Sequence, residues 1–161
     1  MKILTIDPGD ITSGYVLMDG YKPLRFGCAE NDYLLELLEA GSFEADAVII
    51  EMVASYGMSV GKEVFETCVW IGRFWQAAKE YSRVDRIYRL DEKVAICHDS
   101  RAKDTNIRQA LIDRFAQHDF KNGKGTKKKP DWFYGFSKDM WAAFAVGVTW
   151  LDKRQEEKAN H

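Results

Sequence analysis

The first nine residues fix where one central strand of this chain ends. Residues 2–6 (KILTI) are apolar and β-branched, which is typical of a buried strand, and Pro8-Gly9 ends that strand. Asp7 therefore lies at the end of a rigid element. A carboxylate there is costly to bury unless a cation or several hydrogen-bond donors face it. An Asp-Pro-Gly sequence is equally typical of a simple turn, so the function of Asp7 depends on which groups lie beside it.

The size and composition of the chain indicate one folded domain. With 161 residues, we expect a single domain over residues 1–153 and a polar C-terminal tail over 154–161. Cys28, Cys68 and Cys97 are an odd and widely spaced set, which favours free thiols in a cytoplasmic protein over disulfides. Because the sequence shows no signal peptide, lipidation motif or long apolar run, we expect no membrane partner.

The hydrophobic pattern predicts an α/β fold. We expect strands over residues 2–6, 14–19, 24–29, 46–51 and 84–90, with a turn at Asp19-Gly20 that residues 21–23 lengthen. We expect helices over about 32–40, 61–81, 91–97, 103–116 and 137–153. Residues 119–136 carry five lysines and three glycines, which predicts a mobile loop. This order indicates a five-stranded mixed sheet flanked by helices, with three antiparallel N-terminal strands and two parallel ones.

Three carboxylates fall at the ends of these elements. Asp7 ends the first strand, Glu51 ends the fourth, and Asp139 lies in the first turn of the last helix. Like charges that meet in such a sheet raise each other's pKa unless a divalent cation neutralises them. Oxygen ligands favour Mg²⁺ or Mn²⁺, and one or two such ions would activate a water and stabilise the leaving oxygen in phosphodiester cleavage. The sequence therefore predicts a metal site built from these three side chains.

Taken together, these motifs resemble those of the ribonuclease H-like nucleases, and among them the RuvC-type Holliday-junction resolvases, most closely the forms carried by phages. The matching segments are residues 6–9 (IDPG) with Gly14-Tyr15, residues 49–51 (IIE) and residues 139–146 (DMWAAFAV). Residues 90–107 also resemble the region before that family's DNA-contacting helix, with Lys103 at its lysine. The resemblance covers about residues 1–152.

The resemblance implies a ribonuclease H-like sheet and a metal-dependent endonuclease that resolves four-way DNA junctions by paired nicks. Asp7, Glu51 and Asp139 would be the catalytic metal ligands, and Lys103 would assist with phosphate charge. A homodimer would place two such sites on opposite strands of the junction.

One position departs from the family's pattern. The family usually places two acidic or histidine ligands one helical turn apart in the last helix. Here Asp139 has Ala142 three residues after it and Phe136 three residues before it. The fourth ligand is therefore absent, replaced by water, or supplied from elsewhere, for which Asp131 is a candidate. This departure bears on a second metal ion and leaves the first site intact.

Two regions are expected to contact DNA. Residues 54–62 (ASYGMSVGK) follow Glu51, and Tyr56 or Met58 would wedge against an unstacked base at a crossover, with Lys62 ending the segment. A second, basic set would neutralise phosphates and give a salt-sensitive affinity: Arg101, Lys103, Arg108, Lys121, Lys124, Lys127, Lys128 and Lys129. Local packing of residues 54–62 and a solvated lysine loop are the plainer alternatives.

The helix expected over residues 61–81 is more apolar than one face of a sheet requires. Apolar residues recur there at helical spacing (Val64, Cys68, Ile71 and Trp75), and others widen the stripe (Phe65, Val69, Gly72 and Phe74). Core packing accounts for any one of them, but the excess leaves an outer side for a second copy. We expect the homodimer to form through this helix.

Other functions fit parts of the same pattern. A nuclease of this fold that acts on flaps, other branched DNA or RNA–DNA hybrids would also read shape and backbone, which sequence does not separate. A non-catalytic junction-binding protein fits the missing fourth ligand. An actin-like sugar or acyl kinase also opens with a strand, an Asp and a glycine turn, but 161 residues are too few for its second domain.

Overall fold

A five-stranded sheet lies at the centre of the computed structural model, which describes residues 1–161. Its strands are β1 (Lys2–Asp7), β2 (Thr12–Asp19), β3 (Lys22–Glu30), β4 (Ala47–Met52) and β5 (Arg83–Tyr88), in the spatial order β3-β2-β1-β4-β5. The first three strands are antiparallel, and β4 runs parallel to both β1 and β5. The mixed sheet predicted from the sequence is confirmed.

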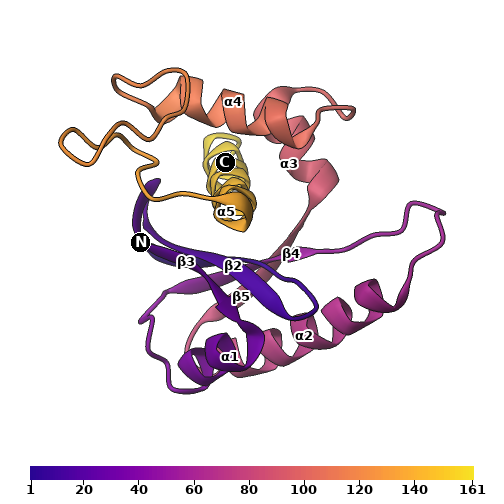
Figure 1. Ribbon diagram of the computed structural model, residues 1–161. Helices are drawn as coiled ribbons and strands as arrows, with labels where there is room; N and C mark the ends of the chain where they lie inside the picture. Colours follow the sequence, from indigo (N-terminus) through magenta and orange to yellow (C-terminus); the bar gives the residue numbers. More distant parts are fainter.

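Helices cover both faces of this sheet (Figure 1). α1 (Asn31–Glu39) and α2 (Lys62–Ala78) lie on one face, and α5 (Lys138–Ala159) crosses the other. α3 (Arg89–Cys97) and α4 (Asp104–Phe115) pack on the outer side of α5, so the molecule has four layers. α5 is therefore buried between the sheet and a second helical layer, and its central residues, from Trp141 to Trp150, are almost all buried.

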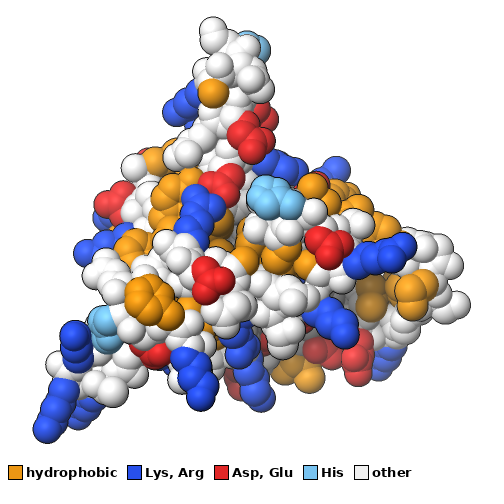
Figure 2. Space-filling model, turned by 90° about the horizontal axis from the view of Figure 1, so that it is seen from above, with side chains coloured by type: hydrophobic (Ala, Val, Ile, Leu, Met, Phe, Trp, Pro, Cys, Tyr) orange, Lys and Arg blue, Asp and Glu red, His pale blue; other side chains and the backbone are white.

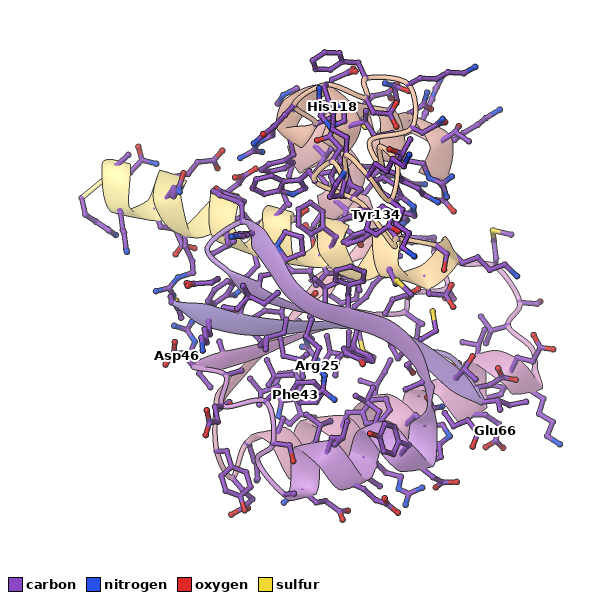
Figure 3. All side chains as sticks on the ribbon, turned by 60° about the vertical axis from the view of Figure 1, so that its left-hand side comes forward. Arg25, Phe43, Asp46, Glu66, His118 and Tyr134 are labelled. Carbon is purple, nitrogen blue, oxygen red and sulfur yellow. The ribbon has the colours of Figure 1, made fainter.

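Alternation along the strands divides the apolar core into two parts. Ile3, Val16 and Ile49 face α5, while their neighbours Leu4 and Ile50 face α1 and α2. On the second side, Arg25 of β3 lies over the ring of Phe43, 5.0 Å from its centroid (Figure 3). The two cores fix the register of the strands, because a slip of one residue would exchange their faces.

Two local predictions about the strands and helices need correction. The β2–β3 turn contains only Gly20 and Tyr21, because Lys22 already pairs with Asp19. The buried stripe of α2 is Thr67, Ile71, Phe74 and Ala78, whereas Val64, Cys68 and Trp75 of the predicted stripe are only half-buried. α2 starts at Lys62 and ends at Ala78. Because its buried side differs from the predicted one, Phe65 and Val69 are exposed.

The segment 116–136, between α4 and α5, is ordered by two aspartates rather than being a loose loop. The carboxylate of Asp131 accepts hydrogen bonds from four backbone N–H groups, those of Gln117, His118, Asp119 and Trp132. Asp119 in turn accepts from the N–H groups of Asn122, Lys124 and Gly125. Figure 3 places His118 and Tyr134 of this segment on the outer side of α5.

These contacts exclude Asp131 as a fourth metal ligand, which corrects that prediction. Its side chain is 1% exposed and both of its oxygens are already bonded to backbone donors. Burial acts to raise the pKa of Asp131, but the N–H groups of Asp119, Gln117, His118 and Trp132 hold it well below its usual range. Phe133 and Phe136 of the same segment are buried against Trp141 and Phe144 in the core beneath α4.

The last helix is longer than the sequence predicts. α5 continues to Ala159, six residues beyond the expected end at Lys153, so most of the expected C-terminal tail is helical. Its last turns are exposed and carry no core contacts, which explains why apolar periodicity gave no signal there. None of the helices has the length and apolar character that crossing a membrane requires.

Removing the Asp131 carboxylate should destabilise the fold. In Asp131→Ala, four backbone N–H groups lose a charged acceptor in a covered position, and we expect the melting temperature to fall by about 5 °C or more. Lys128→Ala, in the exposed part of the same segment, is the matched control and should melt like the wild type. Thermal unfolding followed by circular dichroism measures both, and equal melting temperatures would contradict this account.

Candidate functional site

The parallel register of β1 and β4 brings Asp7 and Glu51 together. Ile6 pairs with Ile50, so the next residue of each strand reaches the same edge of the sheet. Side chains an even number of residues apart in a strand lie on the same face of the sheet. Asp7 therefore lies on the face of Ile3, and Glu51 on the face of Ile49, which is the face covered by α5. The meeting of these two carboxylates, predicted from the strand order, is present in the structure.

Asp139 reaches the same place from the first turn of α5. Gly14 of β2 pairs with Asp7 and lies directly against the backbone of Asp139. A Cβ atom at Gly14 would be 2.5 Å from the Asp139 carbonyl oxygen, so only glycine lets α5 approach this closely. Asp7, Glu51 and Asp139 line one cavity of about 340 Å³.

Basic side chains line the same cavity. Arg89, Arg108 and Lys138 share it with the three acids and with Asp104. Arg108 lies over the ring of Trp141, 5.1 Å from its centroid, which holds the guanidinium against α5. The cavity therefore has acidic groups and phosphate-binding groups side by side.

Glu92, in the first turns of α3, is an acid that the sequence reasoning missed. It has 0% of its surface exposed, and Arg89 donates to its Oε1 at 2.9 Å. Arg89 also pairs with Asp104 on α4. A signal for Glu92 exists in the sequence, since β5 is parallel to β4 and α3 begins directly at its carboxyl end. The sequence prediction missed this signal because it continued the fifth strand to Leu90, whereas β5 ends at Tyr88 and α3 begins at Arg89.

Crowding of these acids shifts their ionisation. Burial, followed by the charges of Glu51 and Asp139, raises the pKa of Asp7 to about 9. Burial and the charge of Glu92 likewise raise the pKa of Glu51 to about 8, although Arg89 opposes that shift. Burial also raises the pKa of Glu92, against the pull of the Arg89 guanidinium. The arrangement is one that a nearby cation would stabilise.

The donor set fits a hard divalent cation. Oε2 of Glu51 and Oε2 of Glu92 are buried and have no hydrogen-bond partner, which is uncommon for polar atoms in a folded protein. Carboxylate oxygens of this kind are the ligands that Mg²⁺ and Mn²⁺ prefer. No group of three or more Asp, Glu, His or Cys side chains is already drawn together as a metal site. The acids that could hold the ion are Asp7, Glu51 and Asp139.

Three of the expected basic DNA contacts line this cavity or the hollow beside it. Arg108 joins it to a second hollow, of about 480 Å³, which Lys121 and Lys124 line. The side chains of Arg101, Lys127, Lys128 and Lys129 are exposed, and Figure 2 shows Lys and Arg side chains gathered where the 116–136 segment projects, at the lower left. Lys103 is exposed at the start of α4 but does not line the cavity, whereas Lys138, which the sequence reasoning missed, does.

Residues 53–61 extend away from the body of the protein between β4 and α2 (Figure 1). Tyr56 and Met58 of this loop are 62% and 75% exposed, and Lys62 at the start of α2 is exposed as well. The side chains of Tyr56 and Met58 therefore do not pack on the sheet. Packing on the sheet was the plainer alternative for this segment.

Two structures of RuvC from Thermus thermophilus match this chain in three dimensions. A structure of that protein has a TM-score of 0.68 at 16% sequence identity and covers 97% of each chain. A structure of RuvC in complex with a Holliday junction substrate has a TM-score of 0.69 at 16% identity, covering 97% of this chain and 96% of that one. This chain has the RuvC fold. The fold that the sequence motifs imply is thereby confirmed.

Sequence comparison gives no such match. Neither a protein-family model nor a curated protein sequence matches the chain. The similarity to RuvC is thus one of backbone architecture over nearly the whole chain.

The raised pKa values predict how the metal-free protein responds to pH. Asp7 and Glu51 keep their protons in the folded state at pH values where the unfolded chain has lost them. The folded state thus binds more protons, so the free energy of unfolding should fall as pH rises from about 4 towards about 9. Urea denaturation in EDTA measures this, and Asp7→Asn should flatten the dependence. A midpoint that rises with pH over this range would contradict the shifts.

Proposed function

We propose that this protein is a divalent-cation-dependent endonuclease that acts on branched DNA, with four-way (Holliday) junctions as its substrate. The observation that carries the proposal is the cavity where Asp7, Glu51 and Asp139 meet Arg108 and Lys138. Acids that suit a divalent cation and bases that suit phosphate are placed together there. The shared fold with a RuvC that is complexed with a Holliday junction substrate supports the choice of DNA.

In this proposal Asp7, Glu51 and Asp139 hold Mg²⁺ or Mn²⁺, one or two ions per site. A bound divalent cation supplies charge neutralisation at the phosphate and promotes ionisation of the water that attacks it. Arg108 and Lys138 bind the phosphate oxygens at the rim of the cavity, so the scissile phosphodiester is oriented between the acidic and basic groups. Lys103, near the start of α4, is a further phosphate contact.

The surfaces around the cavity suit a distorted DNA backbone. Lysines 121, 124 and 127–129, with Arg101, would bind phosphates of one arm, while Tyr56 and Met58 would pack against bases exposed at a crossover. Contacts of these kinds recognise shape and charge rather than base sequence. They support selection of branched DNA by structure.

We further propose that two copies associate through α2. Phe65 and Val69 are 62% and 57% exposed on the side of α2 that faces away from the sheet, although both are large apolar residues. Trp70, beside them, is covered by Arg73, 4.3 Å from its ring centroid. An exposed apolar strip suits a second copy of the same helix, and two copies would present two cavities to two strands of a junction.

Loss of one acid should separate cleavage from binding. Asp7→Asn removes a charged ligand, and we expect cleavage of a synthetic four-way junction in Mg²⁺ to fall by at least ~100-fold, since even changing an outer partner of a metal ligand costs about 10–100-fold. Junction affinity, measured by gel shift in Ca²⁺ or EDTA, should stay within about threefold because the basic surface is intact. Asp113→Asn, an exposed acid on α4, is the matched control.

The substrate is tested in the same assay with duplex, flap and RNA–DNA hybrid controls, in Mg²⁺, Mn²⁺ or EDTA. Paired, symmetric nicks on the junction support the proposal. Preferential cutting of flaps or hybrids would make those structures, rather than four-way junctions, the substrate. Tight binding to the junction with no cutting in either metal would make the protein a non-catalytic junction binder. Unchanged cleavage by Asp7→Asn would overturn the proposed metal chemistry.

A charge placed on the α2 strip should dissociate the dimer. Val69→Glu puts a carboxylate into an apolar contact without disturbing the buried side of α2, so sedimentation should shift from dimer to monomer at micromolar concentration. Paired nicking should become single, uncoordinated nicks. Leu24→Glu, an equivalent change at an exposed apolar site on β3, should remain dimeric. A dimeric Val69→Glu variant would place the interface elsewhere.

A further inference from the structure

Glu92 is a buried carboxylate with one free oxygen next to the proposed cation site. The whole side chain is covered, and its Oε1 accepts from Arg89 at 2.9 Å, whereas Oε2 has no hydrogen-bond partner. It lies against Glu51, and the charge of Asp7 also acts on it; both of these acids line the cavity. An uncompensated carboxylate oxygen in such a place is unfavourable unless something absent from the free protein binds it.

Glu51 has the complementary feature. Its Oε2 is also buried and without a partner, and Glu92 is the acid whose charge most affects it. Two carboxylates of neighbouring elements thus lie against each other, and each has a buried oxygen without a partner. Arg89 does not remove this excess charge, because it is shared between Glu92 and Asp104.

The last helix does not supply a second acid. One turn before Asp139 stands Phe136, which is buried among Phe133, Trp141 and Phe144, and one turn after it stands Ala142. Asp131 is fully engaged with backbone donors. Asp104 also lines the cavity, but it is exposed and paired with Arg89, whereas Glu92 is buried and lies against Glu51.

We propose that Glu92 is a fourth carboxylate ligand of the cation site, supplied by α3 in place of a second acid on α5. This deepens the proposed function and rests on it. Arg89 would hold Oε1 and so fix the rotamer of Glu92, which leaves Oε2 to bind the cation together with Glu51. The deep end of the site, between Glu51 and Glu92, would then carry the ligand that the first turn of α5 lacks.

Metal binding without DNA tests this role separately from cleavage. Titration of purified protein with Mn²⁺, with free Mn²⁺ read by electron paramagnetic resonance, gives affinity and stoichiometry. For Glu92→Gln we expect at least ~10-fold weaker binding, or loss of one equivalent. Glu36→Gln, the same change at an exposed position on α1, should bind like the wild type.

Thermal unfolding of the same variants excludes a purely structural role. Removing one of several crowded charges should leave the metal-free Glu92→Gln variant as stable as the wild type or more so, while the stabilisation given by Mn²⁺ shrinks. If Glu92 only anchors Arg89, the metal-free variant instead melts lower and the Mn²⁺-induced shift is unchanged, which would overturn the proposal. Glu92→Asp keeps the charge and the Arg89 pair but shortens the reach; it should fold and still bind Mn²⁺ more weakly.

The outcomes separate the two proposals. A wild-type protein that cuts junctions but binds Mn²⁺ no better than Glu92→Gln and Glu92→Asp overturns the ligand role alone. A protein whose Mn²⁺ affinity depends on Glu92 but which cuts no branched DNA retains the four-carboxylate site and loses the proposed function.

Discussion

The parallel pairing of β1 with β4 is the constraint on which the site depends. It sets Ile6 opposite Ile50, so the acids that follow reach one edge on one face of the sheet. The other acids arrive by packing on that frame: Asp139 because α5 covers this face, and Glu92 because β5 continues the parallel pairing before α3 begins. A slip of β4 by one residue would turn Glu51 towards α2 and leave Asp7 alone.

Apolar packing on both faces holds together groups that repel one another. The cores beneath α5 and above α1 and α2 are continuous along the strands that carry Asp7 and Glu51, and the raised pKa values of these acids record the opposing electrostatic free energy. Basic groups share this centre: Arg108 and Lys138 line the cavity, and Arg89 lies among the acids, paired with Glu92 and Asp104. Groups of both signs therefore lie within one cavity, where a cation would reduce the repulsion among the acids and a phosphate could pair with Arg108 and Lys138.

The mixed sheet and the meeting of Asp7, Glu51 and Asp139 could be predicted, because alternation, turn residues and strand ends are local signals. The RuvC-type fold was predicted from the resemblance of the motifs to that family. Glu92 was missed, because the prediction continued the fifth strand through Leu90 and so placed the start of α3 beyond the edge of the sheet, whereas α3 begins at Arg89. The ordered conformation of residues 116–136 was not predicted from the sequence for a different reason. Lysines and glycines dominate its composition, while the contacts that fix it are made by Asp119 and Asp131 to backbone groups that only the folded chain brings near. The proposed roles of the acids and of the basic surface stay predictions.

Gly14 gives the site a fixed width. It pairs with Asp7 across the β1–β2 ladder and touches the backbone of Asp139, so the two acids are spaced by one main-chain pair and one van der Waals contact. No flexible side chain lies in that path. A side chain at position 14 would push the first turn of α5 off the sheet, so the absence of one methyl group decides how near the Asp139 backbone lies to the strand that carries Asp7.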